Sequence, residues 1–137
     1  AWGSDITPND TPFEADLGWA VKLRKNIDFM GRTSLQAAAG SALNKRLATF
    51  TVDDPGIVLL GRETILRNGE PVGYLASGGY GYTVGKGIGL GYVRNADGVS
   101  DDFLSSGDYE LVVAMDPVPA RIHLEPLYDP AGARVKA

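Results

Sequence analysis

The chain has 137 residues, enough for one domain or for a small domain with part of another. Hydrophobic residues make up 44% and charged residues 22%, a balance that favours a packed core over disorder. The net charge of -4 argues against nucleic acid or an anionic membrane as the main partner, and no apolar run approaches the roughly 20 residues of a membrane span. The absence of cysteine excludes disulfides, a thiolate nucleophile and cysteine-ligated metals.

Residues 1–45 have a mixed texture. The first twelve are rich in Pro, Asp, Asn and Thr, which predicts loops and turns. The run LGWAVKL (17–23) is compatible with a short strand, and RTSLQAAAGSALNK (32–45) predicts a helix from its alanines and its apolar spacing. We therefore expect a segment of mixed α and β structure before residue 46.

From residue 45 onward the pattern is that of short strands. KRLATFTVD (45–53) alternates, and ETILRNGEPVGYLAS (63–77) predicts a hairpin because Asn68-Gly69 tolerates the positive φ values of a type I′ turn. Further β-rich runs follow at 86–94, 108–116 and 118–126. Five or six strands with no helix between them predict a small antiparallel barrel or sandwich over residues of about 46–130.

SGGYGYTVGKGIGLGYV (77–93) holds seven of the eighteen glycines, so a phosphate-binding loop has to be considered. A P-loop needs glycine five positions before Gly85 and Ser or Thr after Lys86, but these positions hold Tyr80 and Gly87. From Gly85 to Gly91 the glycines fall at every second position, which places them on one face of a strand. The spacing predicts a bare strand face that another backbone crosses closely, or a bend at a barrel corner.

Other polar groups fit structural roles. His123 is the only histidine and is predicted to be a surface or half-buried residue with its hydrogen bonds satisfied, since neither a transition-metal set nor a G-x-S-x-G elbow accompanies it. Asp53-Asp54 and Asp101-Asp102 flank turn-like sequence and predict turn capping. KLRKN (22–26) is either a solvated basic face or a site for a carboxylate ligand.

Several segments, in order, resemble one known family. TPFEADLGWAVKLRKNIDFMGRTSL (11–35) resembles the glycine-cleavage T-protein (aminomethyltransferase) superfamily, whose pattern is roughly T-P-x-E-A-x-L-x-W-x-V, one or two basic residues, and D-F-x-G-[RK]-x-x-L. GRETILRNGEPVGYLASGGYGYTVGKGIGLGYV (61–93) is similar to its C-terminal barrel pattern. WGSDITPNDTP (2–12) and PLYDPAGARVK (126–136) resemble the branch of the folate-binding C-terminal parts of dimethylglycine and sarcosine dehydrogenases and their oxidase relatives.

The resemblance implies a mainly β fold. A small antiparallel aminomethyltransferase-type β-barrel (46–137) would follow the α/β tail (1–45) of an incomplete folate-binding domain. Ala1 is then expected to be a fragment boundary, and the partners are the missing N-terminal folate-binding and FAD domains of the same polypeptide. Tetrahydrofolate would bind a site only partly in this chain, and FAD a separate domain. The implied compartment is the bacterial cytoplasm or the mitochondrial matrix.

The implied reaction moves a one-carbon unit from an N-methyl amine, of dimethylglycine or sarcosine type, to tetrahydrofolate, with this chain inactive alone and carrying no catalytic residue. Arg24 matches a family arginine near the substrate, although Lys22 or Lys25 could be its equivalent, and Tyr128 matches a near-terminal tyrosine of the folate site. The alternatives are a surface cation for Arg24 and barrel-edge packing for Tyr128.

An alternative function is that of a non-catalytic relative, of the pyruvate dehydrogenase phosphatase regulatory subunit type, whose barrel is an interaction surface. The demethylase branch of the superfamily is a third alternative, whereas the tRNA-modification-linked branch is disfavoured, because its K-G-C-[YF]-x-G-Q-E motif is replaced by IDFMGRTS. If part of the domain is missing, apolar side chains made to cover it are expected to be partly exposed. These are Trp2, Phe13, Trp19, Phe29 and Met30.

Overall fold

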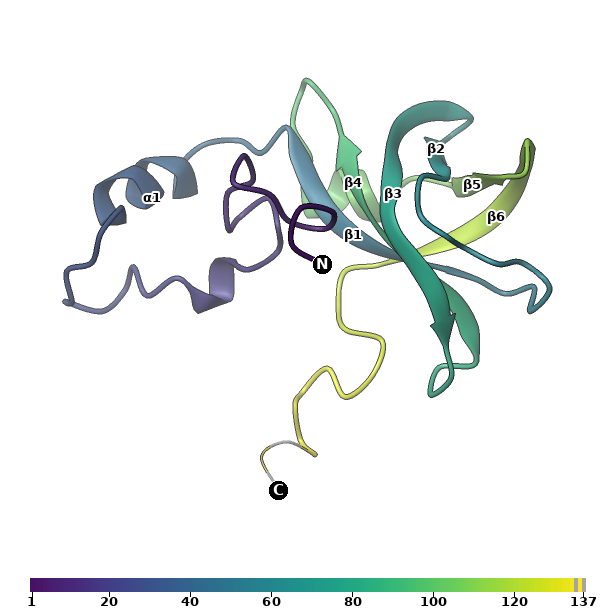
Figure 1. The fold of residues 1–137 in the computed structure, drawn as a ribbon. Coiled ribbons are helices and arrows are strands. Elements are labelled where there is room, and N and C mark those ends of the chain that lie inside the picture. Colours follow the sequence, from purple (N-terminus) through teal and green to yellow (C-terminus); the bar gives the residue numbers. More distant parts are fainter. Residues whose placement is uncertain (135, 137) are drawn as a thin grey trace.

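The computed structural model describes residues 1–134 and residue 136, and its main feature is a closed antiparallel barrel (Figure 1). The strands follow one another around the barrel in the order β1-β4-β3-β2-β5-β6. Their bounds are β1 (Lys45–Val52), β2 (Thr64–Arg67), β3 (Glu70–Gly81), β4 (Lys86–Arg94), β5 (Tyr109–Val113) and β6 (Asp116–His123). The expected mainly β fold is confirmed, as a barrel and not a sandwich.

One hydrophobic core fills the barrel. Alternate residues of β1 point inward, with Phe50 and Val52 fully buried, and Ile65, Leu75 and Leu111 meet them from other strands. The predicted hairpin is confirmed: β2 and β3 are antiparallel and joined by Asn68 and Gly69, whose φ values are 52° and 82°.

The glycine face of β4 is turned toward this core. A Cβ at Gly89 would lie 2.4 Å from the Leu75 side chain, and one at Gly91 would lie 2.6 Å from the Tyr74 carbonyl oxygen. Gly87, Gly89 and Gly91 therefore let neighbouring strands and core side chains approach β4, as the spacing predicted. Gly85, which the spacing also placed on this face, instead lies in the turn before β4, with φ +73° and no atom within 4 Å of a Cβ position.

A short helix between strands corrects one expectation. Helix α2 (Asp101–Ser105) lies between β4 and β5, and the hydroxyl of Ser100 accepts a hydrogen bond from the Phe103 N–H at 3.0 Å. Asp101 and Asp102 occupy its first turn, where negative charge complements the helix dipole. The cap is therefore Ser100, whereas the acidic pair that was predicted to cap a turn lies inside the helix, with Asp101 paired to Arg46.

Residues 1–44, here called the arm, extend to one side of the barrel, and residues 124–134, the tail, run away from it (Figure 1). The predicted strand at 17–23 is wrong: Gly18–Ala20 form a 3-10 helix, because no neighbouring strand is available to pair with that segment. The predicted helix is α1 (Arg32–Ala39), which ends at Gly40 and not at residue 45. No helix among the described residues is long and apolar enough to cross a membrane.

The arm has almost no core of its own. Among its residues, all of which the structure describes, only Ala15 is buried. Trp2 is 76%, Trp19 77% and Met30 100% exposed, while Phe13 and Phe29 are half-buried. The expected exposure of these side chains is confirmed.

Candidate functional site

Two consecutive motifs of the arm each fold one turn and fix a carboxylate. Thr7 and Thr11 each precede proline and stand three residues before an acid, in TPND and TPFE. The backbone N–H and hydroxyl of Thr7 donate to Asp10 Oδ2 at 2.6 and 2.8 Å, and those of Thr11 donate to Glu14 Oε2 at 2.7 and 2.9 Å. In the second turn the Glu14 N–H also donates to the Thr11 hydroxyl at 3.2 Å, which completes a capping box. In both turns proline stands where its missing N–H is not needed.

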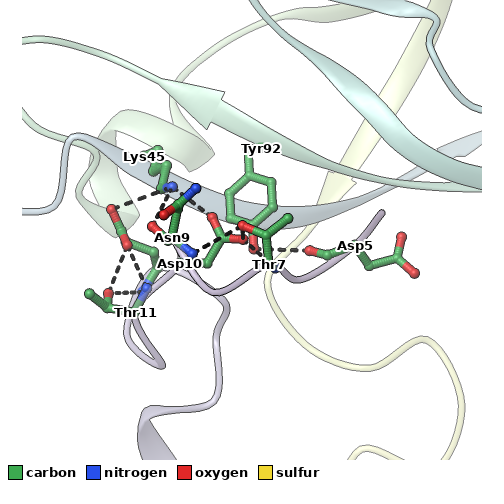
Figure 2. A network of polar contacts seen from close by, with 8 residues as sticks. Asp5, Thr7, Asn9, Asp10, Thr11, Lys45 and Tyr92 are labelled. Atoms are coloured by element: carbon green, nitrogen blue, oxygen red, sulfur yellow. Dashed lines mark hydrogen bonds and ion pairs between the residues drawn. The ribbon is translucent and has the colours of Figure 1, made fainter. Parts of the chain in front are cut away.

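Lys45, the first residue of β1, binds the acids that these turns present (Figure 2). Its Nζ lies 2.6 Å from Asp10 Oδ1 and 4.0 Å from Glu14 Oε1, the oxygens that the threonines leave free. The same Nζ lies 5.5 Å from the centroid of the Tyr92 ring, a cation–π distance. We call Asp10, Glu14, Lys45 and Tyr92 the clamp, because they join the arm to β1 and β4.

Further hydrogen bonds strengthen this junction. The Tyr92 hydroxyl donates to the Asp5 carbonyl at 3.0 Å, the Ser4 hydroxyl donates to the Ala76 carbonyl at 2.8 Å, and the Leu47 N–H donates to the Glu14 carbonyl at 2.7 Å. Burial, followed by the negative charges of Asp10 and Glu14, raises the pKa of Tyr92 to about 12, so its hydroxyl keeps its proton well above neutral pH. The position of the arm on the barrel is thus fixed by polar contacts and not by a shared core.

Asp10 is expected to titrate below pH 3.8. Burial alone would raise its pKa, but hydrogen bonds from Lys45 and Thr7, with the charge of Lys45, lower it from the ordinary value of 3.8. A carboxyl whose pKa is lowered on docking stabilises the docked arm when the pH is above its ordinary pKa. This stabilisation is lost as the pH falls through the pKa of the docked state. The carbon-13 shift of the Asp10 carboxyl, followed by NMR against pH, measures the midpoint. A midpoint at or above 3.8 in the wild-type chain would contradict the clamp.

A cleft of about 330 Å³ lies between the arm, the outer face of the barrel and the tail. This volume is at the lower end of the range for small-molecule sites. His123 lines it, and its Nε2 lies 2.9 Å from the Thr51 hydroxyl oxygen. Burial, with the charges of Arg121 and Lys86, lowers the pKa of His123, so the ring is uncharged at neutral pH. Apolar residues of the lining are Ala15, Leu17, Trp19, Leu47, Ala48, Leu90, Leu124 and Pro126.

Arg24 and Tyr128 lie on different segments. Arg24 is exposed and lines a hollow formed by residues 18–25 of the arm, with Trp19 beside it in the lining. Tyr128 lies in the tail, is 49% exposed and has the Arg134 guanidinium 5.6 Å from its ring centroid. Neither residue lines the cleft at the barrel, whereas Trp19 lines both the cleft and the hollow.

The other polar candidates have structural partners. Asp53 pairs with Lys86 and, at 3.7 Å, with Arg121, while Asp54 Oδ1 accepts the Gly56 N–H at 2.8 Å. The described residues contain no group of three or more His, Cys, Asp or Glu placed to hold a metal ion. Sequence reasoning missed the clamp, although the T-P-x-[DE] motif repeated four residues apart was a readable signal.

The family model for the glycine cleavage T-protein C-terminal barrel domain matches residues 45–129, a range that contains all six strands. The chain belongs to this family. The resemblance read from the sequence motifs is therefore confirmed, and β4 with its glycine face is part of the family's barrel.

Relatives extend the similarity to the arm. The mitochondrial sarcosine dehydrogenase of Mus musculus is 37% identical over 98% of this chain and 15% of its own length. The mitochondrial pyruvate dehydrogenase phosphatase regulatory subunit of Mus musculus is 36% identical over 92% of this chain and 16% of its own length. An aminomethyltransferase of Rubrobacter xylanophilus is 33% identical over 96% of this chain and 34% of its own.

The fold matches a solved relative. A glycine cleavage system aminomethyltransferase T from Bartonella henselae superposes with a TM-score of 0.74 over 94% of this chain and 35% of that one, at 22% identity. The chain thus spans about a seventh of the sarcosine dehydrogenases and between a quarter and a third of the aminomethyltransferases that it matches. These relatives place it in a family of folate-related one-carbon enzymes.

Proposed function

We propose that this chain is the barrel-bearing C-terminal part of an enzyme that transfers a one-carbon unit from an N-methyl amine to tetrahydrofolate. One observation carries the proposal: similarity to sarcosine dehydrogenase runs over 98% of the chain, so it includes the arm as well as the barrel. Another relative, the 4-methylaminobutanoate oxidase (formaldehyde-forming) of Paenarthrobacter nicotinovorans, is 33% identical over 98% of the chain, and its name supports the class of amine but not the folate acceptor. Sarcosine and 4-methylaminobutanoate are both N-methyl amines.

In this proposal residues 1–45 end the folate-binding domain, and the exposed apolar side chains of the arm contact the rest of that domain. Only Ala15 is buried among these described residues, whereas Trp2, Trp19 and Met30 are largely in solvent. Large apolar side chains left in water favour association with a covering surface. The clamp then has a function: it fixes the arm, and whatever the arm contacts, relative to the barrel.

Tetrahydrofolate would accept the one-carbon unit, and this chain would help to bind it. The Arg24 guanidinium is exposed and suits a carboxylate of the ligand, since its planar fork donates two parallel hydrogen bonds. The half-exposed Tyr128 would add a hydroxyl donor from the tail. The glycine stretch lacks the G-x-G-x-x-G spacing of a pyrophosphate-binding loop, and Gly89 and Gly91 lie against Leu75 and Tyr74. FAD is therefore assigned to another domain of the polypeptide, in the mitochondrial matrix or the bacterial cytoplasm.

The first test is a calorimetric titration with tetrahydrofolate. The chain alone is expected to show no binding tighter than about 1 mM, or about -4 kcal/mol, because it supplies only part of the site. The complete polypeptide is expected to bind in the micromolar range. Micromolar binding by the chain alone would mean that the arm and tail hold the whole site, and the proposed location would be wrong.

A second function is favoured by one relative. The regulatory subunit of pyruvate dehydrogenase phosphatase matches the chain nearly as well as the dehydrogenases do. In that case the barrel would serve as a protein-interaction surface only, and the complete polypeptide would not bind tetrahydrofolate. The same titration therefore separates the two functions.

A further inference from the structure

The loop that carries Arg24 is organised around a single side chain. The Arg32 guanidinium donates to the carbonyls of Leu23 at 2.9 Å and Lys25 at 2.8 Å, and it also donates to the carbonyl of Ile27. These residues alternate along the loop, so the backbone of residues 22–27 forms an arch over the guanidinium. We call this segment the arch.

The start of helix α1 holds that guanidinium in place. Arg32 is the first residue of α1, and Gly31 before it has φ +85°, a left-handed conformation that turns the chain back toward the arch. The Phe29 ring lies 5.8 Å from the guanidinium carbon, so the side chain is braced from a second side. Arg32 is half-buried, whereas Lys22, Arg24 and Lys25 are exposed.

The arch also concentrates positive charge in an acidic chain. Residues 22–32 contain Lys22, Arg24, Lys25 and Arg32, against the single acid Asp28, while the whole chain has a net charge of -4. Three of these cations repel one another on the outer side of a short loop. Carbonyl groups that converge on the fourth, Arg32, offset that repulsion and fix the backbone that carries the other three.

We propose that Arg32 is a positioning residue whose guanidinium holds the arch in one conformation and so presents Arg24 to the carboxylate of an anionic ligand. The identity of that ligand rests on the proposed function, whereas the role of Arg32 in fixing the conformation of the arch does not. An arginine suits this task because its several N–H donors lie in one plane and reach separate acceptors at once. Lysine at this position retains the positive charge but makes fewer of the hydrogen bonds to the arch carbonyls. Glutamine removes the positive charge.

Amide hydrogen exchange in the chain itself tests the holding step. The Leu23 N–H donates to the Val21 carbonyl at 3.0 Å and the Lys25 N–H to the Lys22 carbonyl at 3.2 Å, so both amides report on the arch. Arg32→Gln is expected to speed their exchange about tenfold, and Arg32→Lys by a smaller factor. Core amides such as that of Phe50 should not change. Exchange at Leu23 and Lys25 within twofold of the wild-type rate in Arg32→Gln would overturn the proposal.

A matched control is available on the barrel. Arg121 on β6 is a surface arginine with one ion pair, 3.7 Å from Asp53, and its side chain is 69% exposed. Arg121→Gln makes the same chemical change outside the arm and should leave the exchange of the arch unaltered. If it accelerates that exchange as much as Arg32→Gln does, the effect is one of general charge and the proposal fails.

Kinetics of the complete polypeptide test the presentation of Arg24. Arg24→Gln and Arg32→Gln are each expected to raise the KM for tetrahydrofolate about tenfold with little change in kcat, and Arg32→Lys should restore most of the loss. The double variant should be no weaker than Arg24→Gln alone, because Arg32 acts through Arg24. If the KM of the double variant rises about a hundredfold, the two residues act independently, and the proposal that Arg32 acts through Arg24 is overturned. A wild-type polypeptide that does not use tetrahydrofolate would refute the proposed function, and hydrogen exchange would still decide the role of Arg32.

Discussion

Replacing Gly73 with alanine is expected to destabilise the barrel by about 3 kcal/mol, at the upper end of the cost of overpacking. An added Cβ would lie 1.9 Å from the carbonyl oxygen of Tyr92 and 3.1 Å from its carbonyl carbon. Both are backbone atoms of β4, the strand that pairs with β3 at Gly73 and Val93. No rotation of a side chain relieves this contact, so the two strands must separate locally and lose hydrogen bonds of the closed sheet.

Gly79 on the same strand is the matched control. It also lies in β3 and has no atom within 4 Å of the Cβ position, so Gly79→Ala should change stability by no more than about 0.5 kcal/mol. Urea denaturation of both variants, compared with the wild-type chain, gives the two differences. Equal midpoints for the two variants would show that β3 and β4 are not packed as closely at Gly73 as the structure has them.

The barrel was predictable because its signals are local. Asn68-Gly69 needs only its own two residues to accept positive φ, and the surrounding apolar runs then pair across the turn. The alternating glycines of β4 likewise predict one strand face without side chains, although the sequence does not indicate which strand packs against that face. Helix α2 was missed since its five residues are too few for a periodic pattern, and only Ser100 marks its start.

The arm was harder to predict because its contacts are distant in the sequence. Lys45 joins Asp10 across 35 residues, and Tyr92 reaches Asp5 across 87. The segment 17–23 has strand-forming residues, but strand pairing depends on a neighbour that local pattern cannot supply. The folate roles of Arg24 and Tyr128 came from the family resemblance, and both remain proposals; the kinetics described above test that of Arg24.

Lys45→Met is expected to release the arm while the barrel stays folded. The substitution leaves the carboxylates of Asp10 and Glu14, whose side chains are only 8% and 18% exposed, without their cation. A carboxylate with so little contact with water is costly when it has no cation as partner. We therefore expect the free energy that favours docking of the arm on the barrel to fall by about 2 kcal/mol. The Leu47 N–H, which donates to the Glu14 carbonyl, should then exchange roughly thirtyfold faster. The urea midpoint of the barrel should hardly move, since methionine keeps the aliphatic stem at the end of β1.

Lys86→Met is the control for Lys45→Met, because it removes a paired lysine that lies outside the clamp. Lys86 is also paired with an aspartate, Asp53, but the two side chains are 36% and 64% exposed. Ion pairs so open to water contribute from zero to about 1 kcal/mol, so exchange at Leu47 should match the wild-type chain. If Lys45→Met accelerates exchange equally at Leu47 and at core positions such as Phe50, the lysine supports the barrel and not the arm. If it changes neither, the backbone contacts of the arm hold it without the clamp, and the polar network at the junction would have to be assigned another role.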